Sequence, residues 1–150
     1  MGNYSSPRKH SRSSSPSLVE EPAVAYALSS YESIQLSRKG ILKEALLQLA
    51  AQLSMTLQEL AGILHVSEKT LHRYQNDKVL APDLSERALL LSQLYHKGKA
   101  VFGDAANFND WLRTPLPAFR QQAPITLLDT SFGFQLIMEE LGRIEYGIFA

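Results

Sequence analysis

The sequence has 150 residues, of which 45% are hydrophobic and 20% charged, and its net charge at pH 7 is zero. These proportions are ordinary for a soluble globular protein, and the length allows one domain or two very small ones. The absence of cysteine excludes disulfides and thiol chemistry and suits the reducing cytoplasm, where we expect the protein to reside. The longest apolar runs, residues 45–53 and 88–94, are too short and too interrupted to span a bilayer, so we expect no membrane partner.

Charge is distributed unevenly along the chain. Residues 1–40 contain five basic and three acidic side chains, a balance of +2, and residues 41–100 contain seven and six, a balance of +1. Residues 101–150 contain three basic and six acidic side chains, a balance of −3. DNA phosphates would repel this acidic last third, so we expect it to face elsewhere and to bind a protein.

The first twenty residues are rich in serine and basic side chains. Such a segment cannot bury enough apolar surface to offset its ordering entropy, so we predict that residues 1–20 are disordered, as a solvated tail or as a basic arm on DNA. Residues 22–36, PAVAYALSSYESIQL, are more apolar but lack a clean helical stripe. Either a short strand or a short helix fits them, and we expect an ordered segment that packs on the helical body or on a second subunit.

A helical pattern begins after residue 37. We expect Lys39, Lys43, Glu44 and Gln48 to take its solvent face. The opposite face is apolar and should cover the inner surface of the next two helices. It comprises Ile41, Leu42, Ala45, Leu46, Leu49, Ala50 and Leu53.

Residues 56–76 have the spacing of a helix-turn-helix unit. Thr56 and Glu59 fit a capping box, in which the hydroxyl accepts from a backbone amide and the carboxylate reaches back. A short turn at residues 65–66 leads to Ser67, which can cap a second helix. The small Ala61 stands where two helices must approach closely. The inward face of the pair comprises Leu57, Leu60, Ala61, Leu64, Leu71 and Tyr74.

The outward face of the second helix is polar, with the residue types that contact phosphates and base edges. We predict that this helix enters the major groove while Ser67 and Lys78 contact phosphates. Because this part of the chain is nearly neutral, binding should need a dimer and paired half-sites. A similar helix pair can also be a bundle that binds only protein. The predicted DNA-binding residues are Ser67, Lys69, Thr70, Arg73, Asn76 and Lys78.

A loop at residues 78–82 should lead into a long helix. We expect Asp83 and Glu86 to form its capping box and Gly103 to end it. Beyond it, Asn107 can cap a short turn, and the prolines at 115 and 117 forbid a long helix. The predicted apolar face of the long helix comprises Leu84, Ala88, Leu90, Leu91, Leu94 and Tyr95.

The chain should close with a one-turn helix from Pro124 to about residue 129 and a last helix capped by Thr130. We expect an exposed pair between Glu139 and Arg143, and a left-handed stop at Gly147. The apolar tip, residues 148–150, either folds back or docks into a partner. The apolar positions of the last helix are Leu136, Ile137, Leu141 and Ile144.

Nothing in the sequence indicates chemistry of its own. The four histidines, at positions 10, 65, 72 and 96, lack metal-ligand spacing, and no glycine-rich phosphate loop follows a strand. Glu139 and Glu140 are adjacent on a helix and point about 100 degrees apart, so they cannot act as a carboxylate pair. We therefore expect a protein without enzyme activity, metal or cofactor.

The C-terminal third resembles a known family. The motifs are WLRTPLPA at residues 111–118, then Pro124 with LLDT at 127–130 and Gly133, and finally LGRIEYG at 141–147. In this order, behind a helix-turn-helix, they resemble the Xre/MbcA/ParS-type antitoxins over residues 40–150. One departure lies at residues 119–123, FRQQA, where family members usually have a glycine-containing loop.

Together, the residue patterns and the resemblance predict an all-α protein with a disordered tail (1–20), a helical region with the helix-turn-helix (21–103) and a toxin-binding domain (104–150). It implies an antitoxin that inhibits a partner toxin, most commonly a RES-domain toxin that consumes NAD, and that represses its own operon by binding operator DNA as a homodimer or larger assembly. An alternative is a stand-alone Xre-type repressor whose C-terminal part only dimerises. The toxin-binding residues that the resemblance implies are Arg143, Glu145, Tyr146, Gly147, Ile148, Phe149 and Ala150.

Overall fold

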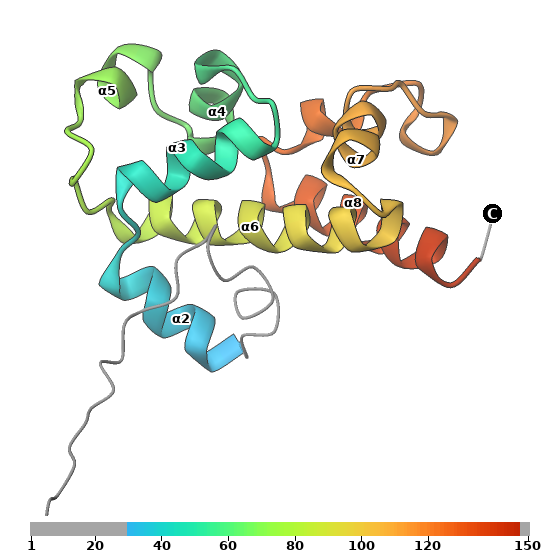
Figure 1. The fold of residues 1–150 in the computed structure, drawn as a ribbon, viewed down its shortest axis with the longest axis horizontal. Helices are drawn as coiled ribbons and strands as arrows, with labels where there is room; N and C mark the ends of the chain where they lie inside the picture. The colour runs from blue at the N-terminus through green and yellow to red at the C-terminus, as the bar shows by residue number, and fades with distance from the viewer. Residues whose placement is uncertain (1–29, 148–150) are drawn as a thin grey trace, which may run out of the picture.

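The computed structural model describes residues 30–147, which form seven α-helices and two short 3-10 helices (Figure 1). This part of the chain contains no strand, only isolated bridges between Leu42 and Val79 and between Leu116 and Gln122. The all-α prediction is confirmed. The predicted tail (1–20), the segment up to residue 29 and the apolar tip (148–150) lie outside the described residues. The elements are α2 (Ser30–Lys39), α3 (Lys43–Gln52), α4 (Leu57–Leu64), α5 (Glu68–Arg73), α6 (Pro82–Phe102), α7 (Ala105–Leu112), η1 (Pro117–Phe119), η2 (Pro124–Leu127) and α8 (Ser131–Glu145).

The long helix α6 is the centre of the molecule, and α2, α4, α7 and α8 all pack against it (Figure 1). It begins at Pro82, which suits the first helical turn because it has no amide hydrogen to satisfy. The predicted capping box of Asp83 and Glu86 is therefore wrong, since Ala81 is the N-cap and no side chain caps the helix. The predicted stop is confirmed: Gly103 has a φ of +89°. Most of the predicted apolar stripe is buried, namely Leu84, Ala88, Leu91, Leu94 and Tyr95.

Helices α3 to α5 lie on one side of α6 and α2 on the other (Figure 1). The described part of the segment predicted as strand or helix is helical, and it packs on α6 of the same chain. Lys43 was predicted to face solvent, which is wrong, because only 6% of it is exposed and its Nζ donates to the carbonyl oxygen of Tyr74 at 2.6 Å. The loop after α5 folds over the start of α3, where the backbone amide of Lys43 donates to the carbonyl of Lys78 at 2.9 Å.

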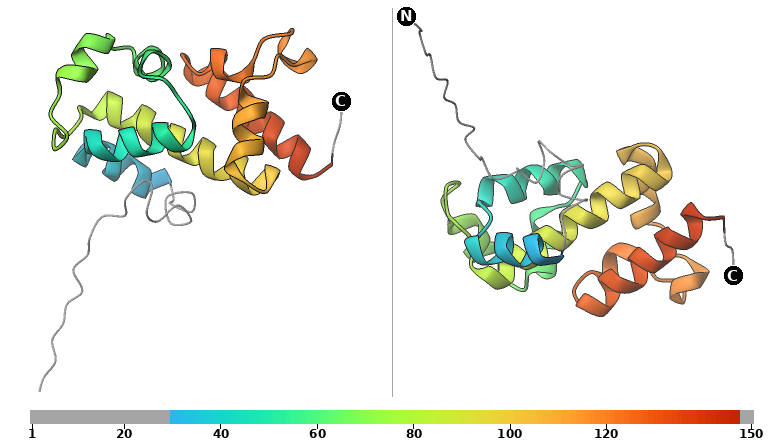
Figure 2. Two further views of the ribbon diagram at one scale, coloured as in Figure 1. Left: turned by 45° about the horizontal axis from the view of Figure 1, so that its top comes forward. Right: turned by 90° about the horizontal axis from the view of Figure 1, so that it is seen from below.

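Helices α7 and α8 cover the C-terminal half of α6 (Figure 2). Gly98 of α6 permits this approach, because a Cβ at that position would lie 2.2 Å from the ring of Phe108. The N-cap of α7 is Asp104, whose Oδ1 accepts from the amide of Asn107 at 2.8 Å, so the predicted cap at Asn107 is wrong. An aromatic cluster joins the end of α6 to α7 and η1. It consists of Phe102, Phe108, Trp111 and Phe119, with ring centroids 5.4 to 6.3 Å apart.

The last two predicted helices have the expected starts. Pro124 opens a single 3-10 turn that ends at Leu127. Thr130 caps α8, because its Oγ1 accepts from the amide of Gly133 at 3.0 Å. Gly147 is left-handed, with a φ of +70°. Among the described residues, none of the helices has both the length and the apolar character needed to cross a membrane.

Candidate functional site

Local caps position the helix-turn-helix. The predicted capping box is present: the Glu59 amide donates to Thr56 Oγ1 at 3.1 Å, and the Thr56 amide donates to Glu59 Oε1 at 2.9 Å. Ser67 caps α5 by accepting from the amide of Thr70 at 2.9 Å. Leu60, Ala61, Leu64 and Leu71 are buried as predicted, whereas Leu57 and Tyr74 are half-buried.

The predicted DNA-contacting side chains divide into two groups. Lys69 and Arg73 are exposed on α5, which is only six residues long. Asn76 was predicted on the same helix, but α5 ends at Arg73, so Asn76 and Lys78 lie in the following loop. Their backbone carbonyls accept from the first amides of α3 at 3.0 and 2.9 Å, while both residues are exposed. The loop is thus held firmly enough to present these side chains at a fixed place beside α5.

The two hydroxyl residues of the predicted set are already engaged with each other. The Oγ of Ser67 accepts from the amide of Thr70 and donates to Thr70 Oγ1 at 2.9 Å. In this geometry only the hydroxyl hydrogen of Thr70 is left to donate to a phosphate or base. Lys69, Arg73, Asn76 and Lys78 are the exposed members of the predicted set that lie outside this hydroxyl pair, and we call the surface that they form the α5 face.

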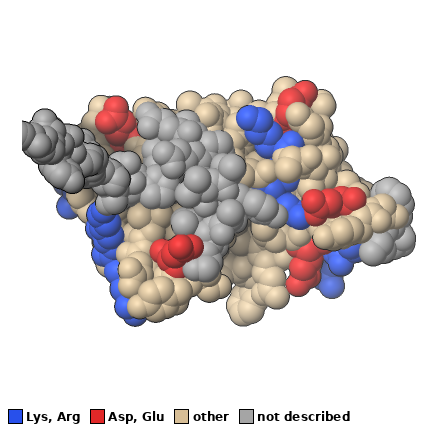
Figure 3. All heavy atoms as spheres, turned by 60° about the horizontal axis from the view of Figure 1, so that its bottom comes forward, with Lys and Arg blue, Asp and Glu red and all other residues tan. Residues whose placement is uncertain are grey.

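Charged side chains of both signs occur on the opposite, α2 side of the molecule (Figure 3). A surface of mixed sign lacks the field that attracts DNA phosphates. Glu68 and Asp77 are also exposed beside the cations of the α5 face, so charge alone does not distinguish the two sides.

The predicted toxin-binding residues at the end of α8 differ in their surroundings. Arg143 Nε bonds Glu140 Oε2 at 2.9 Å, so the predicted pair with Glu139 is wrong; Glu139 instead accepts from Gln135. Glu145 forms an ion pair with Lys97 of α6, which fastens the end of α8 to the central helix. Tyr146 is 77% exposed. Residues 148–150 lie outside the described residues.

The sequence reasoning missed an exposed stripe on α8. Phe132 is 83% exposed, and Leu136, one of the predicted apolar positions of this helix, is 39% exposed. Residues 132, 136, 139, 143 and 146 follow spacings of three and four, so they share one side of the helix. The opposite side is buried through Phe134, Ile137 and Leu141. The sequence could have indicated this stripe, because the helix has apolar residues on two sides and only one side can pack against the core.

Several hydrogen bonds connect the helix-turn-helix to the C-terminal half of the chain. His65, at the left-handed end of α4 with a φ of +60°, has its Nε2 2.6 Å from the carbonyl oxygen of Asp129, next to the cap of α8. Since a carbonyl oxygen can only accept, Nε2 carries the proton. At the other end of α4, Arg113 of the C-terminal half donates to the carbonyl of Ser54 at 2.8 Å and lies 3.4 Å from Glu59. Both ends of α4 are thus tied to the C-terminal half.

Titratable groups offer little chemistry. Among the described residues, no three histidine, cysteine, aspartate or glutamate side chains lie close enough together to hold a metal ion. Burial raises the pKa of the Tyr95 phenol, but this residue belongs to the core of α6.

Comparisons with known proteins match two consecutive parts of the chain. The family of the antitoxin Xre-like helix-turn-helix domain matches residues 32–92, and that of the antitoxin Xre/MbcA/ParS C-terminal toxin-binding domain matches residues 97–147. A protein of Sphingobium sp. (strain YBL2) named Prs ADP-ribosylating antitoxin is 30% identical over 135 residues, which cover 83% of this chain and 85% of the relative. The chain belongs to the Xre/MbcA/ParS-type antitoxins. The predicted family is confirmed.

Two further antitoxins are similar over shorter or more distant matches. Antitoxin Xre of Yersinia enterocolitica is 27% identical over 85 residues, covering 56% of this chain and 57% of the relative. The crystal structure of the M. tuberculosis MbcT–MbcA toxin-antitoxin complex contains a chain with a TM-score of 0.52 and 15% identity, covering 70% of this chain and 94% of that chain. At this identity the likeness shows that the fold is shared.

Residues 119–123, where a glycine-containing loop was expected from the resemblance, form a turn with a left-handed backbone. Arg120 and Gln121 are both left-handed, with φ values of +55° and +65°. They form a tight turn in which the Gln121 amide donates to the carbonyl of Leu116 at 2.8 Å. Glycine adopts this conformation without a steric penalty, whereas arginine and glutamine do not. The loop therefore keeps a glycine-like backbone with less suitable residues.

Proposed function

We propose that this antitoxin neutralises a partner toxin by binding it with the exposed side of α8 and the C-terminal residues that follow. The exposed aromatic side chains of α8 are the main support, because Phe132 and Tyr146 lie outside the core on a helix of the toxin-binding domain. Exposed aromatic groups of this kind are the usual anchors of protein interfaces. Arg143 lies on the same side between them, while Glu145 holds the helix end in place through Lys97.

The toxin we propose is a RES-like protein that consumes NAD. The name of the Sphingobium relative couples an antitoxin to ADP-ribosylation, a reaction in which NAD is the donor. In this proposal residues 147–150 cover the entrance of the toxin's active site. The ring of Phe132, about 20 Å away along α8 at 1.5 Å per residue, contributes affinity and not inhibition.

Co-expression with the toxin gene encoded beside this antitoxin tests the proposal. We expect Phe132→Ala to weaken the complex at least tenfold, because removing an aromatic anchor costs about 2 kcal/mol. Gln48→Ala, which removes an exposed side chain from α3 and not from this side of α8, should leave the affinity within about twofold.

Deleting residues 147–150 separates binding from inhibition. We expect the truncated antitoxin still to co-purify with the toxin but no longer to protect cells. Full protection by the truncated protein would show that the C-terminal mechanism is wrong. Failure of the intact antitoxin to co-purify with any neighbouring gene product would instead favour a stand-alone repressor.

We also propose that the antitoxin represses its own operon by binding DNA through the α5 face as a homodimer. The exposed Lys69 and Arg73 support this, together with the nearby Asn76 and Lys78. The net charge of residues 41–100 is only +1, so one subunit gains little from phosphates, and two subunits on paired half-sites are needed for tight binding.

Gel retardation with the operon's promoter tests the DNA-binding part. Arg73→Ala should abolish retardation at moderate salt and leave toxin neutralisation intact. Arg38→Ala removes the same charge from the exposed surface of α2, on the other side of α6, and should retain binding. Binding should weaken steeply as salt rises, because phosphate contacts release counterions. Retardation that changes neither with Arg73→Ala nor with rising salt would refute the assignment of DNA binding to the α5 face.

A further inference from the structure

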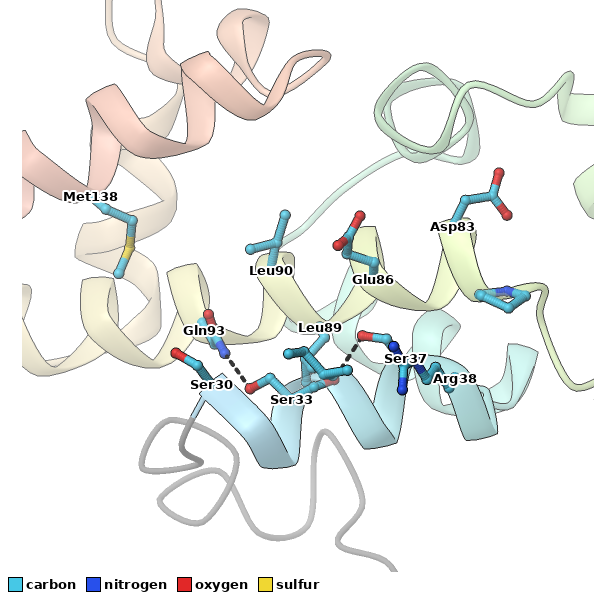
Figure 4. A pocket seen from close by; sticks show the side chains of 12 residues that line it. Ser30, Ser33, Ser37, Arg38, Asp83, Glu86, Leu89, Leu90, Gln93 and Met138 are labelled. Carbon is cyan, nitrogen blue, oxygen red and sulfur yellow. Dashed lines mark hydrogen bonds between the residues drawn. The ribbon is translucent and has the colours of Figure 1, made fainter.

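A groove of about 850 Å³ lies between α2 and α6 and extends to α8 (Figure 4). Its apolar lining includes Ile34 of α2, Leu90 of α6 and Met138 of α8. Ile34 is 45% exposed, and the other two are half-buried. Three helices thus direct apolar groups into a space that the described residues leave open, which is costly in water unless something covers it.

Ser30 lies at one end of the groove, so the residues that directly precede Ser30 in the sequence are tethered beside it. Ser30 lines the groove near Gln93, whose Nε2 donates to Ser33 Oγ at 3.4 Å (Figure 4). The other end lies at Asp83, beside the C-terminal end of α2. Helix α2 therefore runs antiparallel to α6. Traced backward from Ser30, a preceding segment that lies antiparallel to α2 would start beside Gln93 and have its N-terminal end near Asp83.

The sequence directly before Ser30 is suited to this path. Residues 22–28 read PAVAYAL, the most apolar stretch of the chain before α2. In an extended segment alternate side chains point to opposite sides, so Val24, Tyr26 and Leu28 would share one side and three alanines the other. One side of the segment is thus large and apolar while the other is small.

The dimensions also agree. Along α6 the groove extends from Pro82 to Gln93, about 17 Å at 1.5 Å per residue. Seven extended residues span about 23 Å, which is enough to follow the groove along its length. One residue, Ser29, separates the segment from α2. A tether this short gives an effective concentration in the millimolar range or above, which a second copy of the chain in solution does not match.

We propose that residues 22–28 bind in the groove of their own subunit, with Val24, Tyr26 and Leu28 directed toward Ile34, Leu90 and Met138. The segment then covers the apolar surface of α2, α6 and α8 and stabilises their packing against one another. This decides between the two partners expected for this part of the sequence, its own helical body and a second subunit, in favour of the first.

Disulfide trapping tests the proposal cleanly because the natural chain has no cysteine. The full-length protein carrying Tyr26→Cys and Leu90→Cys would be oxidised mildly and analysed by non-reducing electrophoresis and mass spectrometry. We expect a disulfide within the monomer, formed at a rate that is independent of protein concentration, since a bridge requires the two Cβ atoms to come within about 4.5 Å.

The matched control pairs Tyr26→Cys with Gln35→Cys, which is exposed on α2 outside the groove and close to Ser30 in sequence. Its disulfide should form at least tenfold more slowly, because tethering alone does not hold the two thiols together. Equal rates for the two pairs would overturn the proposal, and so would the absence of a disulfide in the first pair. Disulfide-linked dimers would show that a second copy occupies the groove.

A stability measurement provides an independent readout. Replacing Val24, Tyr26 and Leu28 together by serine should lower the melting temperature by about 5 °C or more, because burial of three large side chains is lost. Replacing Ala23, Ala25 and Ala27 by serine makes the same number of changes on the other side of the segment and should have a clearly smaller effect. An unchanged melting temperature in the first variant would overturn the proposal.

Discussion

The two exposed helical surfaces of this antitoxin differ in chemistry, although α8 packs on the central helix α6 and α5 is connected to α6 through α4. The α5 face presents Lys69 and Arg73, whereas the exposed side of α8 presents Phe132, Leu136 and Tyr146. Cationic groups gain from releasing the counterions of a polyanion, and aromatic groups gain from leaving water. In the proposed function the two unlike partners would therefore not compete for a surface, and salt should weaken one interaction far more than the other.

The two halves also differ in how their helices are held. In the helix-turn-helix, side-chain caps from Thr56 and Ser67 fix the starts of α4 and α5, and Gly62 on α4 faces open space. In the toxin-binding half, helices approach each other so closely that two glycines are required. A Cβ on Gly133 would lie 1.6 Å from the carbonyl oxygen of Leu127. Side chains cap α7 and α8 as well, and a Cβ on Gly40 in the first half would also lie too close to Val79, so the halves differ mainly at Gly133, where the neighbouring atom belongs to the backbone.

The largest expected effect comes from alanine at Gly133. Neither the backbone of η2 nor the start of α8 can move away cheaply, so Gly133→Ala should reduce the free energy of unfolding by about 3 kcal/mol or more. The same substitution at Gly62 should instead raise it by about 0.5–1 kcal/mol, because alanine is the better helix former and nothing lies within 4 Å. Urea denaturation measures both.

Gly142→Ala is the control for α8 itself, since it lies on the same helix with nothing within 4 Å of its added Cβ. It should be neutral or stabilising. If Gly133→Ala and Gly142→Ala behaved alike, close packing against η2 would not distinguish the toxin-binding half from the helix-turn-helix.

This difference explains how much of the fold could be predicted from the sequence. Caps made by residues three apart are local, so Thr56, Ser67 and Thr130 were predicted correctly. The errors arise where a distant or competing group decides. Lys43 is buried by the loop after α5, and Pro82 begins α6 before the expected cap at Asp83. No pattern within one helix shows which loop will later cover it.

The candidate site follows the same rule. The polar character of the α5 face is readable from residue types, but the end of α5 at Arg73 places Asn76 in a loop. The exposed stripe on α8 needed knowledge of which side of that helix the core uses. Leu136 and Ile137 are equally apolar neighbours, yet only Ile137 is buried, because α6 packs against one side of α8.

A smaller effect is expected from the hydrogen bonds that join the two halves. Arg113→Ala removes the donors to the carbonyls of Ser54 and Asn109 and the ion pair with Glu59. We expect a loss of about 1–2 kcal/mol in stability, since the guanidinium is only partly exposed and two carbonyls lose a donor. Arg143→Ala breaks a pair within one helix and should cost less than about 0.5 kcal/mol. Chemical denaturation of the two variants makes the comparison, and equal losses would mean that the contact between the halves contributes nothing.

The smallest expected effect has the opposite sign and concerns the turn after η1. Gln121 is left-handed, with a φ of +65°, and a side chain pays about 1 kcal/mol or more for that conformation. Gln121→Gly removes this strain but makes the unfolded chain more flexible, so the net gain should be about 0.5 kcal/mol. Gln122 next to it does not have a positive φ, and its carbonyl accepts from the amide of Leu116 at 3.2 Å. Gln122→Gly should therefore destabilise by about as much, and thermal unfolding of the two variants should give shifts of opposite sign. Shifts of the same sign would mean that the left-handed backbone at residue 121 stores no strain.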